Sequence, residues 1–432
     1  MEITTIYQKI EQYLCGHADE IVRIGDFVLS TPELGYREEK TSAFVRKMLD
    51  KWNIEYTYPH ALTGVKATLK GKKSLFNVCI IGEMDAVKCA GHAHEGDLSA
   101  AHACGHHAQL SAMLGAAMLL KGSGIMSELD GDVTFMAVPA EEFIELGYRN
   151  RLKKEGKINH FGGKQQLIYE GAFDDIDIVM MIHAQGDEPN TKMYVRGSNL
   201  GFVAKTITFT GKAVHGSTPY DGVNALNAAA LSILGIHANR ETFREEEKIR
   251  IHPIVTKGGD VVNSVPDEVV IETYVRGATL DAIKKGCGAV ERAVDGACRM
   301  IGANYKIESI PGYLPLTESH ALSEIFEEVS KNVLGTDSLV CGEPITGSSD
   351  IGDLSHLIPT IQPSIGGFTG TLHSRDFAVT DPSVAYIKAT EILAKTAVEL
   401  LYGNAKKAAR VKASFQPLLT KDEYINYLNE KE

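Results

Sequence analysis

Three short apolar runs, each ending in polar side chains, constrain the fold of this chain more than any other feature. A nearly continuous apolar run of this length is typical of a strand that is buried on both faces. Helical patterns lie between the runs, and strands that alternate with helices indicate an α/β fold. We therefore predict a mixed, largely parallel sheet flanked by helices. The runs are NVCIIGEMDA at 77–86, GDVTFMAVPAEE at 131–142 and IDIVMMIHA at 176–184.

The polar residues of these runs lie at the carboxyl ends of the predicted strands. In an open α/β sheet these ends share one edge, and ligands bind along that edge. A histidine-rich segment, HACGHH at 102–107, follows the first strand. The sequence therefore predicts that one set of polar side chains converges at this edge. The set is Asp85, Cys104, His106, Glu141, Glu142 and His183.

The segment HACGHH places three histidines and a cysteine within six positions. Histidine and cysteine are good ligands for borderline-soft metals. Cys104 and His106 are two residues apart, so both side chains point to one side if the segment is extended. Gly105 between them lets the backbone approach an ion closely. Taken alone, the segment is equally compatible with a buried cysteine and a helix-capping histidine, with the other histidines in solvent.

Two adjacent glutamates, Glu141 and Glu142, end the second run. Adjacent residues at a strand end point in different directions, so one can bind a metal while the other faces a substrate. Taken alone, the two glutamates are also explained as a solvated pair at the start of a helix. His183 and His373, taken alone, are also explained as hydrogen-bonded residues without a metal. Taken together, the set has enough ligands for one or two ions and a spare carboxylate to act as a base, as in two-metal hydrolases.

The pattern changes at about residue 200. Alternating strands and two helices follow in the order β-α-β-β-α-β, which is the split βαβ unit. This order predicts an inserted ferredoxin-like α+β domain at 198–311. The catalytic domain would then be discontinuous, with one part at 1–197 and the other at 312–432.

Composition narrows the class of protein. The formal net charge of the 432 residues is −12, without a basic stripe, which argues against a nucleic-acid partner. No run of apolar residues is long enough to span a membrane. The seven cysteines are scattered and no signal-peptide pattern is present, so we predict a cytoplasmic protein. The metalloprotease motif H-E-x-x-H and the serine-hydrolase motif G-x-S-x-G are both absent.

These segments resemble the cocatalytic metallopeptidase family that holds aminoacylases, hippurate hydrolase, glutamate carboxypeptidases and auxin-amino acid hydrolases. The amidohydrolase branch is the most similar. The matching segments appear in the family order and cover nearly the whole chain, which makes the resemblance specific. They are GEMDA (D-M-D-A in the branch), HACGHH (H-A-C-G-H-D), VPAEE (P-A-E-E), MIHA (G-L-H), FTGKAVHGSTP (G-x-x-x-H-x-x-x-P), VVNSVPDEVVIETYVR (N-x-x-P with a later arginine) and TLHS (the final metal histidine).

The resemblance implies two divalent metal ions per chain, which could be zinc, manganese, nickel or cobalt. It implies that Glu141 is the general base, which would deprotonate the metal-bound water and later protonate the leaving amine. Asp85 would orient a ligand. The implied metal ligands, with the cysteine bridging the two ions, are Cys104, His106, Glu142, His183 and His373.

The resemblance also implies a substrate with a free carboxylate and a homodimer formed through the inserted domain, which would act as a lid. His215 would reach into the site of the partner subunit and polarise the scissile carbonyl oxygen. Asn263 and Arg276 would hold the substrate carboxylate. Gly366 and Gly367 would form part of the pocket wall.

The chain departs from the branch at several positions that bear on the substrate. His107 stands where the branch has aspartate or asparagine, and Glu83 replaces a usual aspartate. The segments GSSDIGD and FGGKQQLIYEGAFDD are more similar to the aminobenzoyl-glutamate hydrolase subgroup. Residues 145–160 resemble an insertion near the metal edge.

We therefore expect a metal-dependent amidohydrolase that cleaves N-acyl amino acids or related carboxylate-bearing conjugates. A dipeptidase or carboxypeptidase of the same family is the alternative among enzymes. A catalytically silent relative that binds a metal or a ligand is the alternative from another class. The presence of Glu141 together with all five implied ligands argues against a catalytically silent protein.

Overall fold

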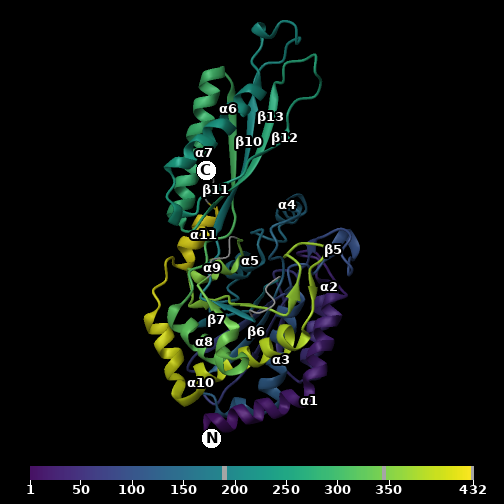
Figure 1. The fold of residues 1–432 in the computed structure, drawn as a ribbon, viewed down its shortest axis with the longest axis vertical. Helices are drawn as coiled ribbons and strands as arrows, with labels where there is room; N and C mark the ends of the chain where they lie inside the picture. The colour runs from purple at the N-terminus through teal and green to yellow at the C-terminus, as the bar shows by residue number, and fades with distance from the viewer. Residues whose placement is uncertain (187–191, 343–346, 430–432) are drawn as a thin grey trace. The chain divides into compact units, whose positions relative to one another are not determined.

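The computed structural model describes residues 1–186, 192–342 and 347–429 (Figure 1). The chain divides into two compact units. Unit 1 comprises Met1–Ser198, Thr317–Pro344 and Asp353–Lys421, and unit 2 comprises Asn199–Leu316, Ile345–Gly352 and Asp422–Glu432.

Unit 1 is built on a six-stranded sheet with the order β1-β2-β6-β3-β7-β16. Neighbours from β6 to β16 run parallel, whereas β1 and β2 add an antiparallel edge. Every residue of β3 and β6 is buried, as their apolar runs predict. The predicted mixed, largely parallel fold is therefore confirmed. The strands are β1 (Tyr56–His60), β2 (Gly64–Leu69), β6 (Asp132–Val138), β3 (Asn77–Glu83), β7 (Ile178–Met180) and β16 (Thr360–Ile361).

Helix α3 (His106–Gly122) is the buried helix of unit 1, and it begins at the candidate metal ligands. It packs on β3 and against two long helices, α1 (Ile3–Leu29) and α10 (Ala389–Ser414). Its residues from His106 to Leu120 are all buried, which explains why the segment is apolar on every face. The core of unit 1 therefore holds the first turn of α3 in a fixed position against the sheet.

The remaining elements of unit 1 are short, apart from two amphipathic helices, α2 and α8. The helices are α2 (Glu39–Lys51), α4 (Leu146–Lys154), α5 (Gly163–Glu170) and α8 (His320–Leu334). The strands are β4 (Val87–Lys88), β5 (Ala100–Ala101), β8 (His183–Ala184), β9 (Met193–Val195), β15 (Leu339–Cys341), β17 (Ser364–Ile365), β18 (Phe368–Thr369) and β19 (Ala378–Val379). Helices α9 (Ile351–Ser355) and α11 (Lys421–Asn429) each begin in one unit and continue into the other.

The third apolar run is divided between two sheets, so the prediction that one strand continues to His183 is wrong. Strand β7 ends at Met180, and His183 belongs to β8 in a four-stranded sheet with the order β15-β9-β17-β8. The backbone still donates hydrogen bonds to the neighbouring segment, from His183 N to Pro363 O at 2.8 Å. Pro363 has no N–H to return such a bond, and the ladder is interrupted there for that reason.

Unit 2 contains an antiparallel sheet covered by two helices that pack on each other. The chain passes through it in the order β10-α6-β11-β12-β13-α7-β14. Burial alternates along β13, as its sequence pattern predicts. The function of unit 2 as a lid stays a prediction. The elements are β10 (Gly201–Thr210), α6 (Ala225–Ala238), β11 (Arg250–Ile251), β12 (Ile254–Lys257), β13 (Glu268–Gly277), α7 (Leu280–Ile301) and β14 (Asn304–Pro311).

The helices of the described residues were compared with the length and hydropathy that a membrane span requires. None of them is both long enough and apolar enough to cross a bilayer.

Gly82 in β3 allows α3 to lie close to the sheet, and its replacement tests this packing. A Cβ atom at Gly82 would be 2.9 Å from Leu110 Cα of α3. We expect Gly82→Ala to lower the free energy of unfolding of unit 1 by about 1–3 kcal/mol, because the helix must move. Urea denaturation followed by the fluorescence of Trp52, the single tryptophan, measures this change.

Gly16→Ala is the matched control. Gly16 lies inside α1, and its added Cβ would meet no atom within 4 Å. We expect it to be neutral or to stabilise by up to about 1 kcal/mol, because alanine is the better helix former. Equal destabilisation by both variants would contradict the packing argument.

Candidate metal centre

Gly105 sets the backbone geometry of the segment that carries Cys104 and His106. It adopts a left-handed conformation with φ of +81° and caps the N-terminus of α3. A Cβ atom at this position would lie 2.2 Å from Ala184 Cβ, beside His183. Glycine is therefore required both by the turn and by the close approach of the β8 segment.

Two groups of potential ligands meet at Cys104. Its Sγ lies 3.5 Å from His183 Nε2 and 3.3 Å from His373 Nε2. One group is Cys104, His106 and His183, and the other is Cys104, Glu142 and His373; within each group the ligand atoms lie within 4.8 Å of one another. The structure thus brings together all five residues that the sequence singled out as metal ligands. The thiol sulfur belongs to both groups, which is the position that a bridging ligand requires.

Asp85 is placed to orient the first group. His106 Nδ1 lies 2.8 Å from Asp85 O and 3.3 Å from Asp85 Oδ1. The other carboxylate oxygen, Oδ2, accepts a hydrogen bond of 3.0 Å from Glu142 N. One buried aspartate therefore holds a histidine ring from the first group and the backbone of a glutamate from the second.

Arg149 is a buried part of the site that sequence reasoning missed. Its side chain is 1% exposed, and its guanidinium donates to Glu142 O and, at 2.8 Å, to Phe161 O. It comes from α4, within the 145–160 segment that was predicted to lie near the metal edge. An arginine in a short polar helix has no periodic signal that separates it from a surface residue, so the sequence offered no indication of this role.

The donors fit divalent ions. His106 Nε2 and Glu142 Oε1 are buried and make no hydrogen bond of good geometry with the described part of the chain. Burial raises the pKa of the Cys104 thiol, and the neighbouring Glu142 carboxylate raises it further. An ion that binds the thiolate must displace this proton, so the affinity for metal falls as the pH falls. Sulfur, imidazole and carboxylate donors together suit zinc, cobalt, nickel or manganese.

His102 and His107 are buried, so the alternative in which the other histidines of HACGHH are in solvent is wrong. Their rings are 5.7 Å apart, and the ring nitrogens of both have no hydrogen-bond partner among the described residues. His107 also packs edge-on against Phe368 and Tyr386. Neither histidine belongs to a group of three or more ligands in the described residues.

The remaining predicted residues lie in three places. His215 and Asn263 are in unit 2, on segments joined by a hydrogen bond of 2.7 Å from Gly216 N to Asn263 O. Arg276, also in unit 2, donates to Ser348 Oγ, and its guanidinium lies over the ring of Phe202. Burial lowers the pKa of Arg276. Gly366 and Gly367 are in unit 1, directly after β17, where Gly366 N donates to Lys192 O.

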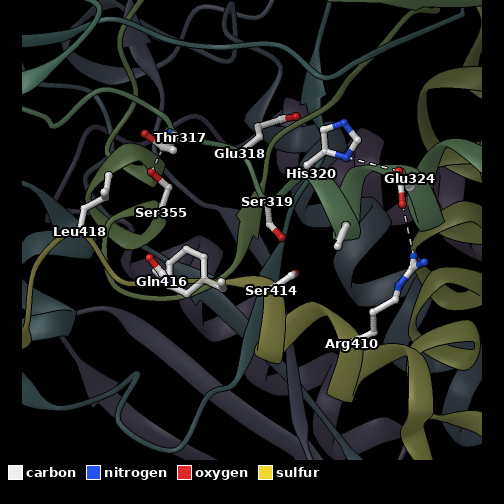
Figure 2. Close-up of a pocket in the computed structure, with 12 residues that line it drawn as sticks. Thr317, Glu318, Ser319, His320, Glu324, Ser355, Arg410, Ser414, Gln416 and Leu418 are labelled. Carbon is white, nitrogen blue, oxygen red and sulfur yellow. Dashed lines mark hydrogen bonds and ion pairs between the residues drawn. The ribbon is translucent and has the colours of Figure 1, made fainter.

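One hollow of the described residues lies in a different part of unit 1 (Figure 2). It has a volume of about 470 Å³ and lies between the start of α8 and the end of α10. Glu324 joins its two sides, 3.4 Å from His320 Nδ1 and 3.4 Å from Arg410 Nη2. None of the predicted site residues lines it, so this hollow is not the candidate metal centre.

Comparison with known proteins identifies the family. The model of Peptidase family M20/M25/M40 matches residues 79–399. The chain belongs to this family. It is therefore a metal-dependent hydrolase that acts on amide bonds.

Individual relatives are distant but cover most of the chain. The IAA-amino acid hydrolase ILR1-like 4 of Arabidopsis thaliana is 26% identical over 79% of this chain and 76% of its own length. The Xaa-Arg dipeptidase of Mus musculus is 24% identical over 98% of this chain and 95% of its own. The crystal structure of the Bacillus subtilis YXEP protein, a dinuclear metal binding peptidase from the M20 family, superposes with a TM-score of 0.71 at 22% identity, covering 90% of this chain and 99% of that one. The superposition shows that the two chains share a fold.

Replacing Cys104 with serine tests the shared position of its sulfur. We expect Cys104→Ser to weaken both ion sites and to abolish the near-ultraviolet charge-transfer band of the cobalt-loaded protein, because a serine hydroxyl supplies no thiolate. Cobalt titration followed by absorbance measures both effects. The exposed Cys15 provides the control, since Cys15→Ser should leave the band and the stoichiometry unchanged. Retention of the band in Cys104→Ser would show that the thiolate is not a ligand.

Proposed function

We propose that the protein hydrolyses the amide bond of N-acyl amino acids or of related conjugates that carry a free carboxylate. The observation that carries this proposal is the placement of the two adjacent glutamates. Glu142 belongs to the ligand group with Cys104 and His373, whereas Glu141 lies in a third group, with Glu83 and His106, that does not contain Cys104. Glu141 Oε2 lies 3.9 Å from His106 Nε2. A carboxylate beside the ligands, but outside the two groups that share Cys104, is placed where a proton-transferring base is needed.

The chemistry follows from these positions. Two divalent ions, when bound, would lower the pKa of water and polarise the scissile carbonyl. Glu141 would take a proton from the attacking water and deliver it to the nitrogen of the leaving amine. Asp85 would keep the proton of His106 on Nδ1, 2.8 Å from the Asp85 carbonyl oxygen, so that Nε2 keeps its lone pair for an ion. Arg149 would hold the Glu142 backbone still during this cycle.

Unit 2 would supply substrate recognition. The Arg276 guanidinium presents donors that match a carboxylate, and Asn263 would support it. His215 would act on the carbonyl oxygen in the site of a partner subunit, within a homodimer formed through unit 2. The ring of His215 is exposed and its Nδ1 lies 2.7 Å from Ser217 Oγ, which leaves Nε2 for such a contact. Gly366 and Gly367 would contribute to the wall of the substrate pocket.

A cytoplasmic location belongs to the same proposal. All seven cysteines are free thiols in the structure. Thiols persist where the compartment is reducing, whereas secreted proteins use them for disulfides. Two of the thiols, Cys15 and Cys341, are exposed and would be open to oxidation elsewhere.

The alternative within the family is a dipeptidase or carboxypeptidase, which the Xaa-Arg dipeptidase relative favours. A peptidase would use the same ions and the same base as the proposed amidohydrolase, so only the preferred substrate distinguishes the two enzymes. A silent binding protein is the other alternative, and the presence of Glu141 beside the ligands argues against it.

Free-amine release from a substrate panel tests the function. The protein is stripped of metal, and manganese, zinc, cobalt or nickel is added back. We expect metal-dependent release from N-acyl amino acids or from aminobenzoyl-glutamate, with dipeptides cleaved more slowly. Preferential cleavage of dipeptides would establish the alternative enzyme. No release with any metal would support a binding protein.

Replacing Glu141 and Glu142 with glutamine, one at a time, tests their separate roles. Glu141→Gln should lower kcat by at least about a hundredfold while both ions still bind, because the base is lost but the ligands remain. Glu142→Gln is the matched variant and should lose one ion. Isothermal titration with manganese, alongside initial rates, separates these outcomes. Loss of an ion in Glu141→Gln with retention in Glu142→Gln would mean that the two roles are exchanged.

A further inference from the structure

Glu83 is a fully buried carboxylate that none of the roles above uses. It is the last residue of β3 and has 0% exposed surface. Its Oε2 lies 3.2 Å from His106 Nε2, the ring nitrogen that would bind an ion. The side chains of both residues are completely buried.

The His106 ring lies between Asp85 and Glu83. Its Nδ1 is 2.8 Å from the main-chain oxygen of Asp85, and its Nε2 faces Glu83 Oε2. Glu83, His106 and Glu141 form a third group, in which the potential ligand atoms lie within 4.8 Å of one another. The Glu83 carboxylate and the ring nitrogen are therefore close enough to bind one ion.

The distance itself is that of two ligands on one ion. Ligand atoms about 2.1 Å from an ion, at tetrahedral or right angles to each other, lie roughly 3.0–3.4 Å apart. The pair Glu83 Oε2 and His106 Nε2 falls in this range at 3.2 Å. So does the pair His373 Nε2 and Glu142 Oε1 of the other ligand group, at 3.3 Å.

Two buried side chains hold Glu83 in place. Lys164 Nζ, from α5, donates to Oε1, and the Lys164 side chain is 0% exposed. Gln109 Nε2, from α3, donates to Oε2 at 2.9 Å. A buried ammonium without its carboxylate would be costly, so the lysine fixes the charge and the direction of Glu83. Oε1 is occupied by Lys164, and Oε2 is the oxygen turned toward His106.

We propose that Glu83 is an oxygen ligand of the ion held by Cys104, His106 and His183, and that Lys164 is the positioning residue for this ligand. The inference rests on the proposed function only in requiring that ions bind; it does not depend on the substrate. With a bound water or substrate, this ion would exceed four ligands. Zinc commonly takes four ligands and sometimes five in catalytic sites, whereas manganese suits six-coordinate sites with oxygen donors, so the added carboxylate should favour manganese over zinc more than the other three ligands alone would.

The direct test is the crystal structure of the full-length protein reloaded with manganese. We expect a Glu83 oxygen about 2.0–2.3 Å from the ion on His106. A Glu83 carboxylate more than about 3 Å from every ion would overturn the proposal, and would mean that it only pairs with a protonated His106. Turnover is not measured, so a protein that shows this ligand but cleaves no substrate would refute the function and leave the inference intact.

Metal titration of Glu83→Gln provides the test in solution. We expect the manganese affinity of one of the two sites to fall at least about tenfold, with a smaller loss for zinc. Unchanged manganese affinity would contradict a ligand role. If Lys164 without its partner prevents folding, the double variant Glu83→Gln/Lys164→Met removes both charges and should fold, yet keep the affinity loss. Restored affinity in the double variant would also overturn the proposal.

Glu38→Gln is the matched control. Glu38 is an equally buried carboxylate of the same unit, and it accepts hydrogen bonds from Thr63 Oγ1 at 2.7 Å and Ala140 N at 2.8 Å. Burial raises its pKa to about 8, so glutamine resembles its neutral form. We expect both ions to bind as in the unchanged protein.

The single variant Lys164→Met tests whether Lys164 positions the Glu83 carboxylate. The carboxylate remains but is no longer fixed, so the visible d–d spectrum of the cobalt-loaded protein should change in shape and intensity. A spectrum identical to that of the unchanged protein would show that Lys164 serves folding only.

Discussion

The concentration of buried acidic groups at one edge of the sheet is the constraint on which the rest of the structure depends. Carboxylates at this edge cannot remain ionised in a low-dielectric interior without cations. Among the described residues, Lys164 and Arg149 are buried cations at this edge. They are too few to balance the whole set, and the proposed metal ions would offset the remaining charge. The acidic groups are Glu83, Asp85, Cys104, Glu141 and Glu142.

Close packing of α3 on β3 holds these acidic groups in a defined geometry. Gly82 lets the helix approach the strand, and Gly105 lets the helix begin beside Ala184. As a result, the strand-end carboxylates and the ligands of the first helical turn are held by two elements that cannot move separately. A site carried on rigid elements keeps its ligand spacing without help from loops.

Much of this centre was predictable from local patterns. Buried parallel strands were evident in the apolar runs, and the polar residues after Glu83 and Val138 had to share an edge. The spacing of Cys104 and His106 predicted that they act together. Other features were not predictable, because each depends on a partner far away in the sequence. Lys164 pairs with Glu83 across 81 positions, and Pro363 interrupts the strand that leads to His183.

The sequence by itself determined the class of fold, the convergence of the strand ends and the chemical types of the ligands, since periodicity and donor chemistry are local properties. The tertiary structure alone decided which donors lie within reach of one another, and that Glu141 lies outside the two groups that share Cys104. It also decided that His102 and His107 are buried without joining a ligand group. The physical reason is that ligand sharing depends on distances of about 3 Å between side chains on separate strands and helices. Such distances are fixed by packing and by hydrogen bonds between distant segments, which no local pattern specifies.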